Sequence, residues 1–286
     1  MDANIFNFSE ITSDFQNWLL HSGITIIVII VTSLILLRFG HIFIEKTIRK
    51  VVRKNGGSKT AEEQREDTLI QVISVTLGVV VITISSLIIM TEFGINITPL
   101  LAGAGIAGVA LGFGAQYLVK DIISGIFILL ENQYGVGDVI CIADKCGSVK
   151  KITLRVTILR DLDGVVHFIP NGEIKIASNL TKSKSNVNLN VGVAYNSDLD
   201  KVKKVINDVG KELAKDKEWK DKIFEPPKVL RVNNLGDSSI EFKITGETER
   251  MAQWSVTGEL RKRLKKAFDK NGIEIPFPQR DIHIKK

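Results

Sequence analysis

Three long apolar segments, none of which contains Asp, Glu, Lys or Arg, dominate the first 130 residues of this 286-residue chain. They run from about residue 18 to 37, from 69 to 90 and from 95 to 119. A helix needs about 20 apolar residues to cross the hydrocarbon core of a bilayer. We therefore expect three transmembrane helices, in a transmembrane domain that covers residues 1–130.

A shorter apolar stretch follows the third segment, directly after the charged pair Lys120 and Asp121. Its uncharged part covers only residues 122–130, which is too short to span a membrane. We expect a lateral helix over residues 121–132, separated from the third span by a break between residues 116 and 121.

The distribution of basic residues predicts the orientation in the membrane. Residues 1–18 contain no Lys or Arg, whereas the connection 38–68 contains eight of them. Basic residues near the ends of spans stay on the cytoplasmic side. We therefore expect the N-terminus outside, the connection 38–68 inside, and the large C-terminal part in the cytoplasm.

The third segment contains the pattern Gly103-x-Gly105-x-x-Gly108, which is typical of dinucleotide-binding sites. That pattern indicates a nucleotide site only between a strand and a helix of a βαβ unit. Here it lies inside an uncharged run of membrane length. We therefore interpret its glycines as a helix-packing surface.

Helical geometry, at about 100° per residue, explains these small residues. Larger side chains share one stripe, formed by Ile106, Val109 and Phe113. Small residues lie on both flanks of the stripe: Gly105, Gly108 and Gly112 on one, and Ala107, Ala110 and Gly114 on the other.

Small residues let membrane helices approach closely. Two smooth flanks would serve two neighbours, as in a closed ring of identical helices, and the stripe would then face the ring axis. Apolar rings around a narrow pore exclude water and ions by dewetting. The residues alone leave one alternative open, a tightly packed helix within a monomeric bundle.

The rest of the chain has the patterns of water-soluble domains. From residue 135 an alternating pattern predicts a β domain over residues 131–180, with a strand from Val149 through Leu154 to Val156. Its predicted turns are at Gly147, Asp163-Gly164 and Asn171-Gly172.

Residues 181–275 have the order strand, helix, strand, strand, helix, which indicates a ferredoxin-like α/β domain. Asp198 is the predicted N-cap of the first helix. The predicted buried faces of the two helices are Val202, Ile206, Val209 and Leu213, and Val256, Leu260, Leu264 and Phe268. Residues 276–286 are expected to end in a strand at Ile282–Ile284.

Residue types that usually carry catalysis are scattered. The four histidines, His21, His41, His167 and His283, lie in separate regions. Cys141 and Cys146 are too few for a zinc site, which needs about four ligands. We expect them to be two reduced thiols near a hairpin rather than a disulfide. The sequence predicts no enzyme activity, no metal and no cofactor.

A basic cluster between Arg261 and Lys266 could indicate a nucleic-acid surface, and the formal net charge is +6. Because these residues lie on the outer side of an amphipathic helix, we interpret them as a solvated face. No nucleic-acid partner is expected.

Several short motifs together resemble the bacterial small-conductance mechanosensitive channel (MscS) family. They are Gly-Phe-Gly-Ala-Gln over 112–116, Val-Gly-Asp-Val-Ile over 136–140, Gly-Ser-Val over 147–149, Leu-Arg-Val-Thr over 154–157, Ile-Pro-Asn-Gly over 169–172, Gly-Val-Ala-Tyr-Asn-Ser-Asp over 192–198 and Ile-Pro-Phe-Pro-Gln over 275–279. The resemblance covers essentially the whole chain.

This resemblance implies a multi-domain homoheptamer in the bacterial inner membrane, with three membrane helices, a Sm-like β domain, an α/β domain and a C-terminal barrel strand. It implies a channel that membrane tension opens, releasing ions and small osmolytes during hypoosmotic shock. The implied pore seal is Val109 and Phe113, with Ile106 and Gln116 also lining the pore. The implied helix-packing residues are Gly105, Gly108, Ala110 and Gly112.

The chain departs from the family pattern at two places. Many relatives have leucine at both seal positions, where this chain has Val109 and Phe113. The usual kink glycine after the conserved glutamine is replaced by Tyr117, so Gly125 is a second candidate for the hinge.

Three other classes of protein would have different sequence features. A secondary transporter would show more spans, repeats and ionisable residues at the membrane midplane. A membrane-tethered RNA-binding module would need aromatic and basic residues interleaved on a strand face. A structural scaffold would not require two smooth flanks on one helix.

Overall fold

The computed structural model describes residues 19–52 and 59–284, which belong to two compact units. The first unit extends to Phe113 and the second begins at Gly114. The boundary falls inside one long helix, so the two parts of that helix are described with the unit to which each belongs.

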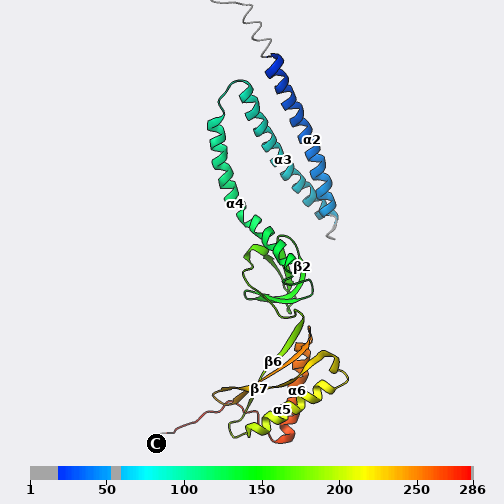
Figure 1. The fold of residues 1–286 in the computed structure, drawn as a ribbon, viewed down its shortest axis with the longest axis vertical. Coiled ribbons are helices and arrows are strands. Elements are labelled where there is room, and N and C mark those ends of the chain that lie inside the picture. Colours follow the sequence, from blue (N-terminus) through cyan, green and yellow to red (C-terminus); the bar gives the residue numbers. More distant parts are fainter. Residues whose placement is uncertain (1–18, 53–58, 285–286) are drawn as a thin grey trace, which may run out of the picture. The chain divides into compact units, whose positions relative to one another are not determined.

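The described residues of the first unit are mainly helical (Figure 1). A short π-helical turn at Leu19–Gly23 leads into α2 (Ile24–Val52), which is followed by α3 (Lys59–Glu92) and by the first part of α4 (Thr98–Leu130). Among the described residues, three helices are long and apolar enough to cross a membrane, which confirms the three predicted spans.

Both α2 and α3 extend beyond the apolar runs that predicted them. Much of the predicted basic loop 38–68 is therefore helical. Hydropathy marks only the part of a helix that can lie in hydrocarbon, whereas Lys, Arg, Glu and Gln outside that part also favour helix. Residues 53–58 lie outside the described part of the chain.

Small and polar residues hold α2 and α3 side by side. A Cβ atom added to Gly40 would lie 2.4 Å from Leu77 Cδ2, so the helices approach closely there. The hydroxyls of Ser33 and Ser85 are 2.6 Å apart. Near the charged ends, the Arg49 guanidinium donates to Glu66, which is buried, at 3.2 Å.

The predicted break between the third span and the lateral helix is wrong. Helical structure continues without interruption from Thr98 to Leu130. The physical reason is local, because residues 116–121 contain neither glycine nor proline and nothing there interrupts the backbone hydrogen bonds. The lateral helix is the last part of α4.

A five-stranded antiparallel sheet follows α4. Its strands are β1 (Val139–Ile142), β2 (Lys145–Ile152), β3 (Val156–Arg160), β4 (Val166–Pro170) and β5 (Ala177–Asn179), in the order β4-β3-β2-β1-β5. Its core is formed by Tyr134, Ile140, Ile142, Val149 and Leu159, together with Ile128 from the end of α4.

Two local predictions for this sheet are wrong. Gly147 lies inside β2 rather than in a turn. Its glycine serves close packing instead, because a Cβ atom there would come within 2.6 Å of Arg160 O on the neighbouring strand. Leu154 lies in the turn between β2 and β3 rather than in a strand. The predicted turn at Asp163-Gly164 is confirmed, and Gly164 has a φ of +86°.

The expectation of two reduced thiols is also wrong for this structure, in which Cys141 and Cys146 form a disulfide. The hairpin explains it, because β1 and β2 pair these two residues directly and place their Cα atoms 4.0 Å apart. The sequence spacing did not reveal that the turn between them is only two residues long.

The C-terminal part is a three-stranded sheet with two helices on one face (Figure 1). Its elements are β6 (Lys184–Val193), α5 (Leu199–Lys215), β7 (Ile223–Leu235), β8 (Ile240–Glu249) and α6 (Gln253–Asn271), with the strand order β6-β8-β7. A short 3-10 turn lies between α5 and β7 at Lys220–Lys222, and another lies between β4 and β5 of the preceding sheet at Asn171–Glu173.

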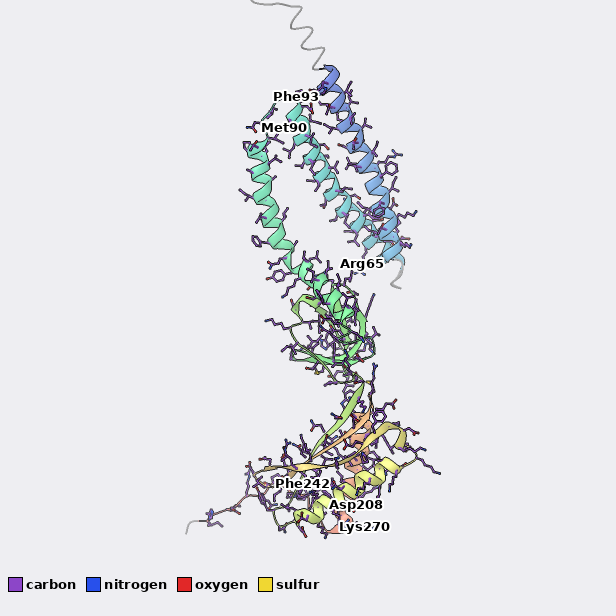
Figure 2. All side chains as sticks on the ribbon, in the orientation of Figure 1. Arg65, Met90, Phe93, Asp208, Phe242 and Lys270 are labelled. Carbon is purple, nitrogen blue, oxygen red and sulfur yellow. A yellow bond between two sulfur atoms is a disulfide. The ribbon has the colours of Figure 1, made fainter. Side chains whose placement is uncertain are left out.

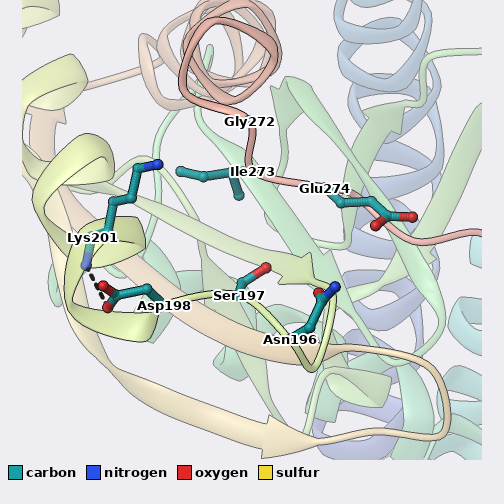
Figure 3. A pocket seen from close by; sticks show the side chains of 7 residues that line it. All are labelled: Asn196, Ser197, Asp198, Lys201, Gly272, Ile273 and Glu274. Atoms are coloured by element: carbon teal, nitrogen blue, oxygen red, sulfur yellow. Dashed lines mark hydrogen bonds between the residues drawn. The ribbon is translucent and has the colours of Figure 1, made fainter.

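The predicted helix faces of this part are confirmed, since all eight of their residues are buried. Phe242 lies among them in the core, whereas Asp208 and Lys270 point outward (Figure 2). The Asp198 carboxylate caps α5 by accepting hydrogen bonds from the Asp200 and Lys201 amides (Figure 3).

The predicted strand at Ile282–Ile284 is not formed in the described residues, where 272–284 contain no strand. A strand needs a partner for its backbone hydrogen bonds. Ile282 and Ile284 are both exposed, and no described residue of 276–284 belongs to either sheet. Residues 285–286 lie outside the described part.

Asp138 joins the two sheets within the second unit. Its Oδ2 accepts hydrogen bonds from Gly135 N and Asn179 Nδ2, both at 2.9 Å. Its Oδ1 lies 2.6 Å from Arg250 Nη2, which follows the last strand of the C-terminal sheet. One buried carboxylate therefore connects the start of β1 with the end of β8.

This junction predicts acid sensitivity. Burial raises the pKa of Asp138, but hydrogen bonds from Gly135, Asn179 and Thr181 and the Arg250 charge outweigh it, so the pKa lies below its usual value. Because this carboxyl is more acidic in the folded than in the unfolded state, its ionised form stabilises the fold at any pH above its unfolded-state pKa of about 3.9. That stability is lost as the pH falls through its folded-state pKa. We expect Asp138→Asn to reduce stability at pH 7 by about 1–3 kcal/mol and to flatten its fall below about pH 4.

Thermal unfolding of the detergent-solubilised chain at pH 7 and at acid pH measures both effects. Asp237→Asn, at an exposed aspartate in the β7–β8 turn, is the matched control and should change neither. Equal acid dependence in the wild type and the Asp138 variant would contradict this role.

Candidate functional site: the helix α4 and its attachment

None of the described residues covers the first part of α4. Every residue from Thr98 to Lys120 is exposed among the described residues, although the segment carries no charge before Lys120. An apolar helix that is exposed on all sides must be covered by lipid or by other protein. This is the part that the sequence predicts to line a pore.

The predicted stripe of larger side chains lies on one side of this helix. Ile106, Val109 and Phe113 are spaced by three and four residues and are 75%, 60% and 70% exposed. Gln116 continues the stripe by three more residues, and it is exposed as well. The described part of the chain supplies no contact that would explain three large apolar residues in this position.

The glycines beside the stripe have no neighbour within the described chain. A Cβ atom added to Gly105, Gly108 or Gly112 would meet nothing within 4 Å. Elsewhere in the same chain, glycines such as Gly125, Gly147 and Gly210 lie against backbone atoms that a Cβ would strike. The glycines of the pore segment therefore suit contacts with something outside the single chain.

After Lys120 the helix changes character and buries one face on the five-stranded sheet. The buried residues are Asp121, Gly125 and Ile128, spaced by four and three residues. Ile128 enters the core of the sheet. The last part of α4 is thus attached to this domain along one side.

A buried carboxylate fixes the start of this attachment. Asp121 Oδ1 accepts a hydrogen bond of 2.8 Å from the Gly172 amide, and Oδ2 lies 3.5 Å from Arg155 Nε. Asp121 is only 6% exposed, so a side chain without an acceptor oxygen there would leave the Gly172 donor without its partner.

Close contact with backbone atoms holds α4 on the sheet one helical turn after Asp121, at Gly125. A Cβ atom at Gly125 would lie 2.2 Å from Leu154 O and 2.5 Å from Asn171 Nδ2. The helix therefore packs closely on these loops at Gly125. Tyr117, in contrast, is 76% exposed, and its role as a hinge stays a prediction.

Asn171 organises the loops that receive Gly125. Its Nδ2 donates to the carbonyl oxygens of Thr153 and Leu154, both at 2.9 Å, and its Oδ1 accepts from Thr157 Oγ1 at 2.9 Å. The hydroxyls of Thr157 and Tyr134 are 3.1 Å apart. Burial raises the pKa of Tyr134, so this network stays uncharged at neutral pH.

Sequence reasoning missed most of this attachment. Asp121 was interpreted as the end of a span, and Asn171-Gly172 as a turn. The available signal was a single acidic residue inside an otherwise apolar helix, which requires a partner when it is buried. The partner itself, a backbone amide 51 residues away, has no sequence signature.

The described residues contain no group of three or more His, Cys, Asp or Glu side chains that could hold a metal ion. The polar pocket at the start of α5, lined by Asn196, Asp198, Lys201 and Glu274 among others, contains groups that bond within the chain (Figure 3). Lys201 Nζ donates to Asn271 O at 2.7 Å, and Asp198 caps the helix.

Comparison with known proteins covers most of the chain. Residues 75–116 match the family described as mechanosensitive ion channel, transmembrane helices 2/3, and residues 117–182 match the mechanosensitive ion channel beta-domain. Residues 187–275 match the C-terminal domain of the mechanosensitive ion channel MscS.

Individual relatives agree. A small-conductance mechanosensitive channel of Caldanaerobacter subterraneus subsp. tengcongensis is 36% identical over 87% of this chain and 88% of its own length. The moderate conductance mechanosensitive channel YbiO of Escherichia coli is 31% identical over 92% of this chain, which corresponds to 36% of YbiO. The crystal structure of Helicobacter pylori MscS in its closed state matches with a TM-score of 0.62 at 25% identity, over 90% of this chain and 98% of that one.

The attachment of α4 predicts opposite effects for two mid-helix glycines. Gly125→Ala should destabilise the second unit by about 1–3 kcal/mol, because its Cβ would overlap Leu154 O. Gly258→Ala in α6, where a Cβ meets nothing within 4 Å, should stabilise it by about 0.5–1 kcal/mol.

Thermal unfolding of the two variants beside the wild type measures the sign of each change. If Gly125→Ala raised the unfolding temperature as Gly258→Ala does, the close contact between α4 and the sheet would be refuted.

Proposed function

The chain belongs to the MscS family of mechanosensitive ion channels, and we propose that membrane tension opens it to release ions and small osmolytes during hypoosmotic shock. It is a membrane channel and not an enzyme. Family membership decides against a secondary transporter and against a membrane-tethered RNA-binding module. The observation that carries the proposal is the first part of α4, which is apolar and exposed on every side.

We propose that copies of this segment surround the pore as a ring, a heptamer by the family resemblance. The flank formed by Gly105, Gly108 and Gly112 would pack against the flank of the next copy that contains Ala110. Small residues on both surfaces allow the close approach that membrane helices use. Since each helix has two such flanks, each can contact two neighbours and close the ring.

In that ring the remaining stripe faces the axis. Val109 and Phe113 would form the two apolar rings of the closed seal, with Ile106 above them and Gln116 below as further lining residues. Apolar constrictions of this kind stop ions by losing their water rather than by filling the pore with side chains. The unusual Val109 and Phe113 pair would set how tightly this chain closes.

Opening requires a second packing of similar energy, which tension favours because it occupies more membrane area. The smooth flanks would let neighbouring pore segments tilt and slide, which withdraws the seal from the axis. The fixed contacts of Asp121 and Gly125 favour a hinge nearer Tyr117 than Gly125. Membrane lipids are the remaining partners, on the exposed apolar faces of α2 and α3.

The proposed location is the bacterial inner membrane, with the N-terminus outside and the second unit in the cytoplasm. The segment 276–286 would then find strand partners in the equivalent segments of the other copies, forming a small barrel on the axis. This accounts for the exposure of Ile282 and Ile284 in one chain.

The direct test is reconstitution of the purified protein in liposomes and recording from patches under increasing suction. We expect discrete currents that appear above a tension threshold and are absent from patches of empty liposomes. A correctly inserted protein that stays silent until the patch ruptures would refute opening by tension.

The seal predicts a specific leak. Val109→Ser should hydrate the constriction, so ions should cross without suction and the resting conductance should rise well above that of the wild type. Leu111→Ser is the matched control, because Leu111 lies on the opposite side of the same helix, about 200° away at 100° per residue. The resting conductance of patches from both variants provides the measurement. Equal leak in the two, or none in either, would place the seal elsewhere.

A further inference from the structure

The two cysteines of the chain lie at the tip of the hairpin formed by β1 and β2. They pair across the hairpin as Cys141 and Cys146 and are joined by a disulfide with a sequence separation of 5. Neither the pore nor the attachment of α4 uses them. The sulfur chemistry of this hairpin is therefore separate from the channel function described above.

The hairpin prearranges the pair. The connection is the two-residue turn Ala143-Asp144, in which Ala143 has a φ of +51°. Side chains alternate along a strand, so Ile140 and Ile142 enter the core while Cys141 points to the other face. Cys146, directly opposite, lies on that same outer face of the hairpin.

Solvent reaches this outer face. Cys146 is exposed and Cys141 is half-buried, so a dissolved thiol can approach the bond from the side of Cys146. The disulfide closes only a short loop, so it restricts the unfolded chain little and adds little stability over the reduced form. Neither burial nor a long closed loop therefore protects this bond from exchange.

We propose that Cys141 and Cys146 are a reversible thiol–disulfide site that exchanges with small-molecule thiols and disulfides. In the proposed cytoplasmic orientation, where stable disulfides are rare and those present serve redox regulation, such a pair alternates between two states. The chemical class of its reagent is a low-molecular-weight thiol and its disulfide.

Two molecules of the small thiol supply all the electrons and protons that reduction of the disulfide needs. A thiolate attacks the Cys146 sulfur, which breaks the bond to Cys141, leaves a mixed disulfide at Cys146 and releases the Cys141 thiolate, which takes up a proton. A second thiolate attacks the sulfur of the small molecule and frees Cys146. The protein gains two electrons and two protons, and two thiols become one disulfide. Oxidation is the same sequence reversed.

The test is a redox titration of the full-length chain in detergent, in buffers with different ratios of reduced to oxidised glutathione. Each sample is acid-quenched and alkylated with N-ethylmaleimide, and its intact mass is measured. We expect two adducts in reducing buffer and the loss of both together in oxidising buffer, with the chain still monomeric on a non-reducing denaturing gel.

Three results would overturn the proposal: both thiols open to alkylation in the most oxidising buffer, a bond that stays closed in the most reducing one, or a disulfide between chains. Because the readout is covalent mass, it does not depend on whether the channel conducts. Failure of the redox site and failure of the proposed channel function are therefore distinguishable.

Variants test the geometry. Cys141→Ser removes the resolving thiol, so the oxidised sample should hold one stable glutathione adduct at Cys146 instead of an internal bond. The combination Cys146→Ser with Lys145→Cys keeps two cysteines but moves one to the opposite face of β2. That combination should form no internal disulfide. If it closed as readily as the wild type, chain proximity rather than the paired register would explain the bond.

Discussion

The buried contact between Asp121 and the Gly172 amide is the interaction on which the rest of the structure depends. It places a charged group inside the protein at the point where α4 stops being exposed and begins to pack on the five-stranded sheet. A buried carboxylate is tolerated only where donors satisfy it, and here a backbone amide and Arg155 do so. This requirement fixes the axial position of the helix on the sheet.

Gly125 adds a steric condition to this electrostatic one. With no Cβ, it lets the helix lie directly against Leu154 O, and Asn171 fixes that carbonyl by donating a hydrogen bond to it. The glycines about three to six turns earlier in the same helix have no such neighbour. One residue type thus serves two purposes, close contact within the chain at Gly125 and, in the proposed ring, close contact between chains at Gly108.

The sequence predicted what periodicity can encode. Three membrane helices, the fold class of each soluble part and the buried faces around Ile206 and Leu260 follow from the spacing of apolar residues, and the structure has them. Charge and hydropathy did not predict where helices end, because α2 and α3 continue into charged residues outside the apolar runs. The break expected before Asp121 was inferred from charge alone, whereas the backbone there has no reason to stop.

What sequence could not predict are contacts between distant backbone atoms. The partner of Asp121 is an N–H group, and that of Gly125 is a carbonyl oxygen, neither of which depends on the identity of the residue that carries it. The Cys141–Cys146 bond was missed for a related reason, since a spacing of five residues becomes a direct pair only with a two-residue turn at Ala143-Asp144. The junction at Asp138 likewise joins groups from three separate segments.

A single helix that is smooth over one part and fixed over the other has a mechanical consequence for the proposed channel. Its backbone hydrogen bonds run unbroken from Thr98 to Leu130, so a displacement of the pore segment must be absorbed by bending or be passed on to the sheet. The contacts of Asp121 and Gly125 resist movement of the last part. In the proposed channel, bending would therefore be concentrated between Phe113, proposed as part of the seal, and Asp121, in the segment that contains Tyr117. Gly114 is the single glycine of that segment, and the exposed Tyr117 stands where the family pattern has a kink glycine, so this departure would stiffen the helix there in the proposed channel.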